Sequence, residues 1–148
     1  MSYKIAYTIA PTELPAADKA RAMVSFMEEF YATSDDPTAH DKYVASFTPD
    51  ATLIMGPKVG KGSEEIRTLR HGLWTHVAQR KHTPEKIYFG GPNELMLHGK
   101  VAYVLKASGN EVVVPWAARV EFAFDESGGN PKMKFYQVYL DTAAQSGK

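Results

Sequence analysis

Two side chains of this sequence are candidates for proton chemistry, a tyrosine and a histidine. Tyr31 ends a predicted helical stripe, where its hydroxyl could donate a hydrogen bond to a ligand carbonyl or a developing oxyanion. A buried tyrosine at a helix end can equally pack in the core and bond a backbone carbonyl. His71 carries an imidazole, the side chain that titrates near neutral pH and can shuttle a proton. We therefore predict Tyr31 and His71 as the catalytic residues of any enzyme built on this chain.

Aromatic and methionine side chains are predicted to line an apolar pocket around that pair. The predicted ligand-binding residues are Met55, Trp74, Tyr103, Trp116 and Tyr136. Trp74 lies one helical turn after His71, so the two either frame a pocket mouth or sit partly exposed in solvent. Trp116 follows Pro115, which favours a bulge or an edge, and it either stacks on a ligand or fills the core. A lining with few charges indicates an apolar or aromatic small molecule as the ligand.

Composition excludes several other classes of partner. Lysine and arginine (17) balance aspartate and glutamate (17) without any basic run, which argues against nucleic acid and anionic membranes. The chain has no cysteine, and its five histidines lack the spacing of paired metal ligands, so we predict no metal site. No apolar run approaches the roughly 20 residues of a membrane helix, and no signal-peptide pattern opens the chain. We expect a soluble, cytoplasmic protein.

The whole chain has 148 residues, which predicts a single domain. The hydrophobic pattern of its first half is helical. A stripe from Ala20 to Tyr31 predicts a first helix, and Asp36 is the predicted N-cap of a second. A third helix is predicted from Ser63, with Leu73 and Val77 still on its core stripe. Residues 52–55 are predicted to form a short hinge strand between the second and third helices.

From Thr83 onward the hydrophobic period changes to two, which is typical of strands. We predict strands at residues 86–89, 94–98, 101–106, 111–124 and 132–141. Gly99 and its neighbours are read as a turn, like the glycine pairs elsewhere in this half. Residues 1–14 are an arm or an edge strand, residues 15–141 the folded domain, and residues 142–148 a polar tail that we expect to be disordered.

The order of these elements resembles the nuclear-transport-factor-2-like superfamily and its SnoaL-like group. The pieces that carry the resemblance are residues 30–56 (FYATSDDPTAHDKYVASFTPDATLIMG), residues 62–69 (GSEEIRTL) and residues 132–141 (KMKFYQVYLD). The resemblance implies an α+β fold, a cone-shaped half-barrel with three N-terminal helices on a curved mixed or antiparallel sheet that encloses a pocket. It also implies cofactor-free chemistry and a homodimer formed through the open sheet face.

The catalytic sets of the fold match this chain poorly. Of the ketosteroid-isomerase set, Tyr31 matches, but the base position falls on Met55 and the second acid beside Ala118. The epoxide-hydrolase positions fall near Leu105, Ala107 and Val138, and the SnoaL cyclase acid also falls on Val138. A dehydratase of the scytalone type needs an aspartate where Ala32 stands and strand histidines near Ile87 and Trp116.

Two classes of function remain open from the sequence. The first is a SnoaL-like pocket protein that binds an apolar or aromatic molecule, and that could be a cofactor-free isomerase, cyclase or dehydratase of secondary metabolism. The second is a non-catalytic dimeric adaptor, which would use the outer sheet face and the alternating arm at residues 3–9. A diverged enzyme with Glu121 as its acid is a further reading, and it requires a bulge at Pro115 to reverse that strand's faces.

Overall fold

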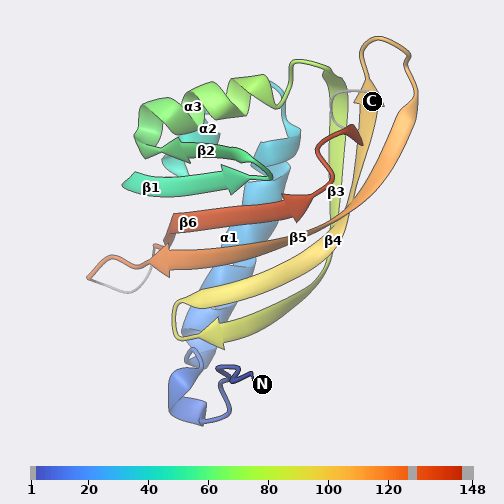
Figure 1. Ribbon diagram of the computed structural model, residues 1–148. Coiled ribbons are helices and arrows are strands. Elements are labelled where there is room, and N and C mark those ends of the chain that lie inside the picture. Colours follow the sequence, from blue (N-terminus) through green and yellow to red (C-terminus); the bar gives the residue numbers. More distant parts are fainter. Residues whose placement is uncertain (1–2, 127–129, 145–148) are drawn as a thin grey trace.

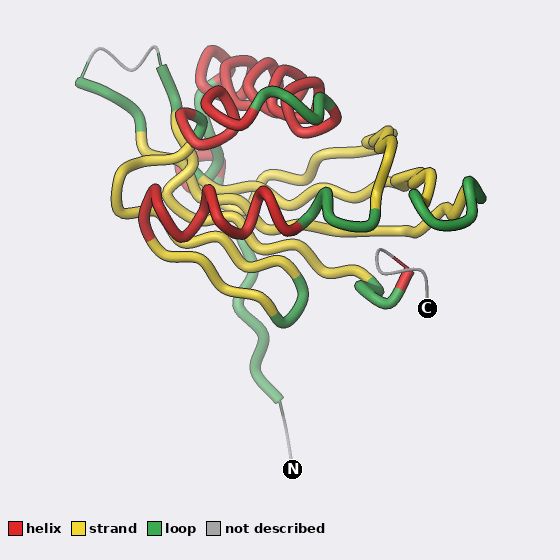
Figure 2. The backbone as a smooth tube through the Cα atoms, turned by 90° about the horizontal axis from the view of Figure 1, so that it is seen from above, coloured by secondary structure: helices red, strands yellow, loops and turns green. Residues whose placement is uncertain are grey.

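A long, bent sheet forms the body of the protein, and its helices cover one face (Figures 1 and 2). The computed structural model describes residues 3–126 and 130–144. The helices are α1 (Ala17–Asp35), α2 (His40–Ala45) and α3 (Gly62–Gly72), after a 3-10 turn at Pro11–Glu13. The strands are β1 (Phe47–Met55), β2 (Lys58–Lys61), β3 (Val77–Gly91), β4 (Glu94–Leu105), β5 (Glu111–Ala123) and β6 (Lys132–Leu140).

The six strands form one mixed sheet in the order β2-β1-β6-β5-β4-β3. Every neighbouring pair is antiparallel except β1 and β6, which run parallel. In Figure 1, α2 and α3 lie at the end of the sheet that carries β1 and β2, while α1 crosses behind the long strands. The predicted α+β architecture, three helices on a curved and unclosed sheet, is confirmed.

An aromatic cluster fixes α1 to the sheet. Met23, Met27 and Phe30 lie on one face of α1 and are almost fully buried, as their helical spacing requires. The Phe30 ring is the centre of the cluster, with five aromatic rings at centroid distances of 5.2–6.3 Å. These rings belong to Phe26, Tyr31, Tyr43, Phe47 and Tyr136. Contacts of this kind hold the C-terminal half of α1 over the middle of the sheet.

The third helix is shorter than predicted, and the residues that follow it belong to a strand instead. α3 ends at Gly72, so Leu73 caps the helix and Val77 opens β3, where it pairs with Leu105. The spacing of Leu69, Leu73 and Val77 suits a helix, but a long strand partner supplies hydrogen bonds that override this local preference. As a result, residues 77–82 belong to a strand, and Val77, Arg80 and His82 point to its buried side, with a register shift between Val77 and Gln79.

The predicted turn at Gly99 is also wrong, because β4 runs unbroken from Glu94 to Leu105. A Cβ atom at Gly99 would collide with the carbonyl oxygen of Thr83 and the Cα atom of Pro84 on the neighbouring strand. β3 and β4 shift register at Pro84. Glycine is therefore needed here for the close approach of two backbones in a bent sheet.

Two predicted helix starts differ from the structure. Asp36 does not cap α2, which begins at His40; its carboxylate instead accepts hydrogen bonds from the backbone and hydroxyl of Thr38 at 2.9 and 2.8 Å. α3 begins at Gly62, one residue before the predicted start at Ser63, and Lys61 occupies the N-cap position. The pairing of β4 with β5 stays regular through Pro115, so Glu121 remains on the outer face, beside Arg119 at 3.5 Å.

The first and last described segments of the chain lie apart in Figure 1. Residues 3–9 form no helix or strand, and the side chains of Tyr3, Ile5, Tyr7 and Ile9 are 76–83% exposed. Ala144, in the predicted polar tail, packs against the core, and residues 145–148 lie outside the described part. Within residues 3–126 and 130–144, no helix is both long and apolar enough to cross a membrane.

Candidate active site

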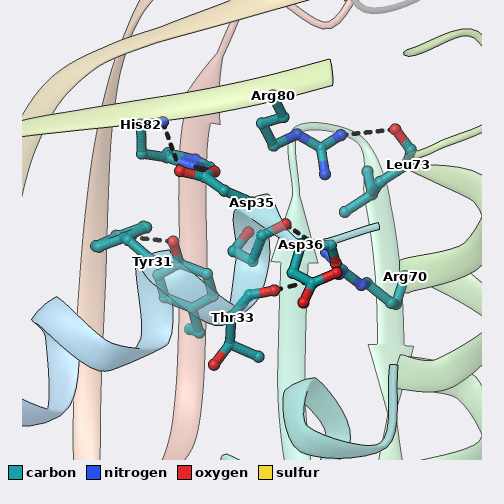
Figure 3. Close-up of polar contacts among 10 residues, drawn as sticks. Tyr31, Thr33, Asp35, Asp36, Arg70, Leu73, Arg80 and His82 are labelled. Atoms are coloured by element: carbon teal, nitrogen blue, oxygen red, sulfur yellow. Dashed lines mark hydrogen bonds and ion pairs between the residues drawn. The ribbon is translucent and has the colours of Figure 1, made fainter. Parts of the chain in front are cut away.

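The last residue of α1, Asp35, contacts both the ring and the backbone of His82 on β3 (Figure 3). Nδ1 of His82 lies 2.6 Å from Oδ1 of Asp35, and the backbone N–H of His82 donates to Oδ2 at 2.9 Å. The side chains are largely buried, with 13% of His82 and 16% of Asp35 exposed. β3 is the edge strand of the sheet, so this carboxylate also satisfies an N–H that no neighbouring strand can reach. The imidazole is therefore fixed in position and in orientation.

The electrostatics of the pair favour a neutral histidine. Burial lowers the pKa of His82 below its ordinary value, and the hydrogen bond to Asp35 opposes that shift only in part. A neutral imidazole that meets a carboxylate through Nδ1 must carry its proton there, which leaves a lone pair on Nε2. This is the protonation state that a general base needs at neutral pH.

Two tyrosine hydroxyls meet beside this histidine. The hydroxyl of Tyr31 lies 2.9 Å from that of Tyr136, and both side chains are buried. The Tyr31 ring packs against His82 at 4.8 Å and against Trp116 at 5.1 Å. Burial raises the pKa of both tyrosines well above the ordinary value. Because one hydroxyl of such a pair donates to the other, the second keeps a proton that it can donate elsewhere.

Arg80 precedes His82 by two residues and points to the same side of β3. Its side chain is buried, and Nη2 donates to the carbonyl oxygen of Leu73 at 2.6 Å. The guanidinium lies over the rings of Trp74 at 4.4 Å and Tyr103 at 5.5 Å. Burial lowers the pKa of Arg80, and among the described residues no carboxylate lies within ion-pair distance of it.

A second buried arginine, Arg70 on α3, binds the C-terminal end of α1, next to the site. Its guanidinium donates to backbone oxygens at the end of α1: to Ser34 at 2.7 Å, to Thr33 at 3.3 Å and to Asp36 at 2.5 Å. Helix ends leave carbonyls without helical partners, and Arg70 supplies those partners here. Burial lowers its pKa to about 10, so the group remains charged at neutral pH. Arg70 therefore fixes the end of α1 that presents Asp35.

The side chains of this region enclose a small cavity between α1 and the sheet. It is lined by Ser34, Tyr43, Met55, Leu73, Arg80, His82, Val101, Tyr103, Trp116, Tyr136, Val138 and Leu140. Its volume of about 20 Å³ suffices for one or two water molecules. A wider depression of about 640 Å³ lies between β2 and α3, but it is shallow and its charged side chains belong to the exposed surface. The enclosed cavity is therefore where buried titratable groups converge.

The structure brings most of the predicted site residues together. Met55, Tyr103, Trp116 and Tyr136 line the cavity, and Tyr31 lies directly behind it through its contacts with Tyr136 and Trp116. Trp74 is buried one layer away, between the guanidinium groups of Arg70 and Arg80. It does not frame an open pocket mouth, because both arginines cover its ring.

His71 lies elsewhere. Its side chain is exposed on α3, and its ring packs on that of His40 at a centroid distance of 4.0 Å. It is not among the residues that line the cavity. The helical turn that links His71 to Trp74 rotates the histidine away from the sheet, so a proton shuttle in the cavity needs a different residue.

The residues that sequence reasoning missed are Asp35, Arg80 and His82. Arg80 and His82 sit two apart, which is the spacing of one strand face, but the change to a strand period was placed at Thr83 and the strand itself was predicted to begin only at Lys86. The dehydratase-type positions were sought at Ala32, Ile87 and Trp116, whereas the aspartate and histidine of this chain stand at Asp35 and His82. Among the described residues, no cluster of three or more metal-ligating side chains forms.

No family model matches the sequence, and a comparison with curated protein sequences finds no match. Solved structures do match. A candidate scytalone dehydratase from Novosphingobium aromaticivorans gives a TM-score of 0.69 at 14% identity, over 83% of this chain and 84% of that one. A candidate SnoaL-like polyketide cyclase from Jannaschia gives 0.66 at 15% identity, over 94% of both chains. Nuclear transport factor 2 from Cryptosporidium parvum gives 0.69 at 12% identity, over 86% and 98%. At such identities the likeness concerns the fold alone, and the fold of this chain is the nuclear-transport-factor-2-like fold.

Proposed function

We propose that this protein is a cofactor-independent enzyme that removes a proton from a small molecule, with His82 as the general base. The observation that supports this most directly is the buried imidazole whose Nδ1 lies 2.6 Å from the Asp35 carboxylate, and burial lowers its pKa. Asp35 is a positioning residue: it selects the tautomer and stabilises the imidazolium that forms. Structures named as a dehydratase and a cyclase, and a protein described as having a ketosteroid isomerase-like fold, share this architecture, which agrees with such proton chemistry.

The chemistry follows from the three groups at the cavity. Nε2 of His82 takes a proton from a carbon acid, and the electron pair left behind moves onto a neighbouring carbonyl oxygen. The Tyr31–Tyr136 pair donates a hydrogen bond to that oxyanion from a site where water is scarce. The imidazolium then returns the proton, either to another carbon, which completes an isomerisation, or to a leaving group, which completes an elimination.

The substrate must make room for itself. A cavity of about 20 Å³ is far smaller than a typical small-molecule site of roughly 300–1,000 Å³. Met55 lines it and has the flexible side chain best suited to move aside. We therefore propose that Met55, Tyr103, Trp116 and Tyr136 contact an apolar or aromatic substrate after such a rearrangement.

Replacing His82 by glutamine is expected to abolish turnover, while replacing His71 by glutamine is not. General bases contribute about 10²–10⁴-fold to rate, so turnover by His82→Gln should fall by at least about 100-fold. The assay incubates each protein with a panel of β-hydroxy and β-halo carbonyl compounds in D₂O and follows elimination and deuterium uptake by mass spectrometry. Turnover that survives in His82→Gln but disappears in His71→Gln would replace this assignment with the exposed histidine.

A second candidate function is that of a dimeric adaptor, and we propose that a second copy of the chain covers the outer sheet face in either case. That face exposes Met96 (39%), Val113 (54%) and Tyr139 (46%) on three adjacent strands, opposite the helices. These side chains share one face of the sheet, and a second copy would remove their apolar surface from water. The arm at residues 3–9 offers further apolar side chains to a partner.

Replacing Val113 by glutamate is expected to convert a dimer into a monomer, because the interface would then bury an unpaired charge. Light scattering after size exclusion measures the mass. Leu14→Glu is the control, since Leu14 is 39% exposed but precedes α1 and does not belong to the sheet. A wild-type monomer, or a dimer that tolerates Val113→Glu, would contradict the proposal. Deleting residues 1–11 tests the arm separately.

A further inference from the structure

The cavity contains more hydrogen-bond donors than the surrounding protein satisfies. Trp116 is 4% exposed and lines the cavity, yet its indole Nε1–H has no acceptor within the described part of the chain. A buried donor without an acceptor costs about 1–3 kcal/mol, so its retention needs a reason. A ligand that accepts a hydrogen bond would supply one.

The cavity also carries an excess of positive charge. Arg80 lines it and is 6% exposed, and no described carboxylate pairs with it. Among the described residues its backbone carbonyl acceptor is that of Leu73, and further N–H groups of the guanidinium remain for other acceptors, including the Tyr103 hydroxyl. The nearest buried carboxylate, that of Asp35, is committed to His82. Buried arginine without a counter-charge is costly, whereas an anion in the cavity would offset that cost.

Arg70 shows what a purely structural arginine looks like in the same core. It donates to three backbone carbonyls, and it does not line the cavity. Arg80 differs on both counts. The planar guanidinium of Arg80 suits a carboxylate better than a single oxygen atom, because it can donate two parallel hydrogen bonds.

We propose that the substrate is an organic acid whose carboxylate binds between Arg80 and the indole N–H of Trp116. This inference rests on the proposed function, since it assigns the substrate class of the same cavity. Arg80 and His82 stand two residues apart on one strand face, roughly 6.6 Å along the strand. A carboxylate held at Arg80 would therefore place a carbon near it within reach of Nε2 of His82.

Formate and formamide test this proposal, because they match in heavy atoms and differ in charge. In two-dimensional ¹H–¹⁵N spectra the protein has two indole N–H signals, from Trp74 and Trp116, and Trp74→Phe assigns them. Titration with formate at constant ionic strength is expected to move the Trp116 signal saturably, while formamide leaves it in place. Equal shifts for both compounds, or no shift for either, would overturn the proposal.

Variants test the carboxylate site at Arg80 and the general base His82 independently of each other. Arg80→Met should weaken formate binding at least tenfold, Arg80→Lys should keep most of it, and Arg119→Met on the outer face should change nothing. If Arg80→Met does not fold, formate binding by Arg80→Lys and the comparison with formamide still test whether a carboxylate binds at Arg80. His82→Gln should bind formate within about threefold of wild type while losing turnover. Wild-type formate affinity in Arg80→Met would sink the carboxylate site and leave the general base standing; full turnover in His82→Gln would do the reverse.

Discussion

Asp35→Asn is expected to slow turnover by roughly 10³-fold while leaving the fold intact. Asparagine keeps the shape of the side chain, but its amide can donate to Nδ1 of His82, which forces the imidazole proton onto Nε2. A base that is protonated at the working nitrogen cannot accept the substrate's proton, and the imidazolium loses its stabilising carboxylate. The measurement is the rate with the best compound of the panel, combined with ¹⁵N spectra of the His82 ring.

The ¹⁵N spectra show whether Asp35 sets the tautomer of His82 or only holds its ring in place. Wild-type protein should show His82 with its proton on Nδ1 at pH 7, and Asp35→Asn should show it on Nε2. Asp36→Asn is the matched control, because Asp36 is the next residue, is exposed, and among the described residues its carboxylate bonds only Thr38. A slow Asp35→Asn variant with an unchanged tautomer would assign the loss to geometry rather than to proton placement.

Arg70→Met is expected to lower the free energy of unfolding by about 3–5 kcal/mol. The methionine keeps the apolar part of the side chain but leaves the carbonyls of Thr33, Ser34 and Asp36 without their buried donor. Each unsatisfied carbonyl costs about 1–3 kcal/mol. The carbonyl of Asp36 is only partly buried, so water can replace part of its lost hydrogen bond. For a protein of this size the loss corresponds to a decrease in Tm of roughly 10 °C. Urea titration followed by circular dichroism measures it.

Arg67→Met provides the comparison from the same helix. Arg67 pairs with Asp41 at 2.7 Å, but both side chains are substantially exposed, at 42% and 95%. Exposed ion pairs contribute about 0–1 kcal/mol, so this variant should unfold close to wild type. Equal effects at the two positions would mean that Arg70 does not hold the end of α1. A preserved Arg70→Met stability would have the same meaning.

Much of the fold was predictable because its signals are local. The spacing of Met23, Met27 and Phe30 indicates one buried helical face, and the strict alternation through Trp116 and Ala118 indicates a strand with one face in the core. Both predictions are confirmed. The errors occur where the local signal has two solutions: Val77 continues a helical stripe and also starts a strand, and Gly99 suits a turn as well as a tight crossing of two strands.

The sequence alone determined which side chains are aromatic lining, and Tyr31, Tyr103, Trp116 and Tyr136 do gather around one cavity. It could not show that Asp35 and His82 meet, since 47 residues separate them and their contact depends on where β3 begins. Only the tertiary structure decides this. Arg70 fixes the end of α1, strand pairing sets the face of His82, and burial of both makes the imidazole neutral. The chemistry of the site depends on distances between elements, and such distances arise from packing, whereas sequence periodicity specifies only the faces that pack.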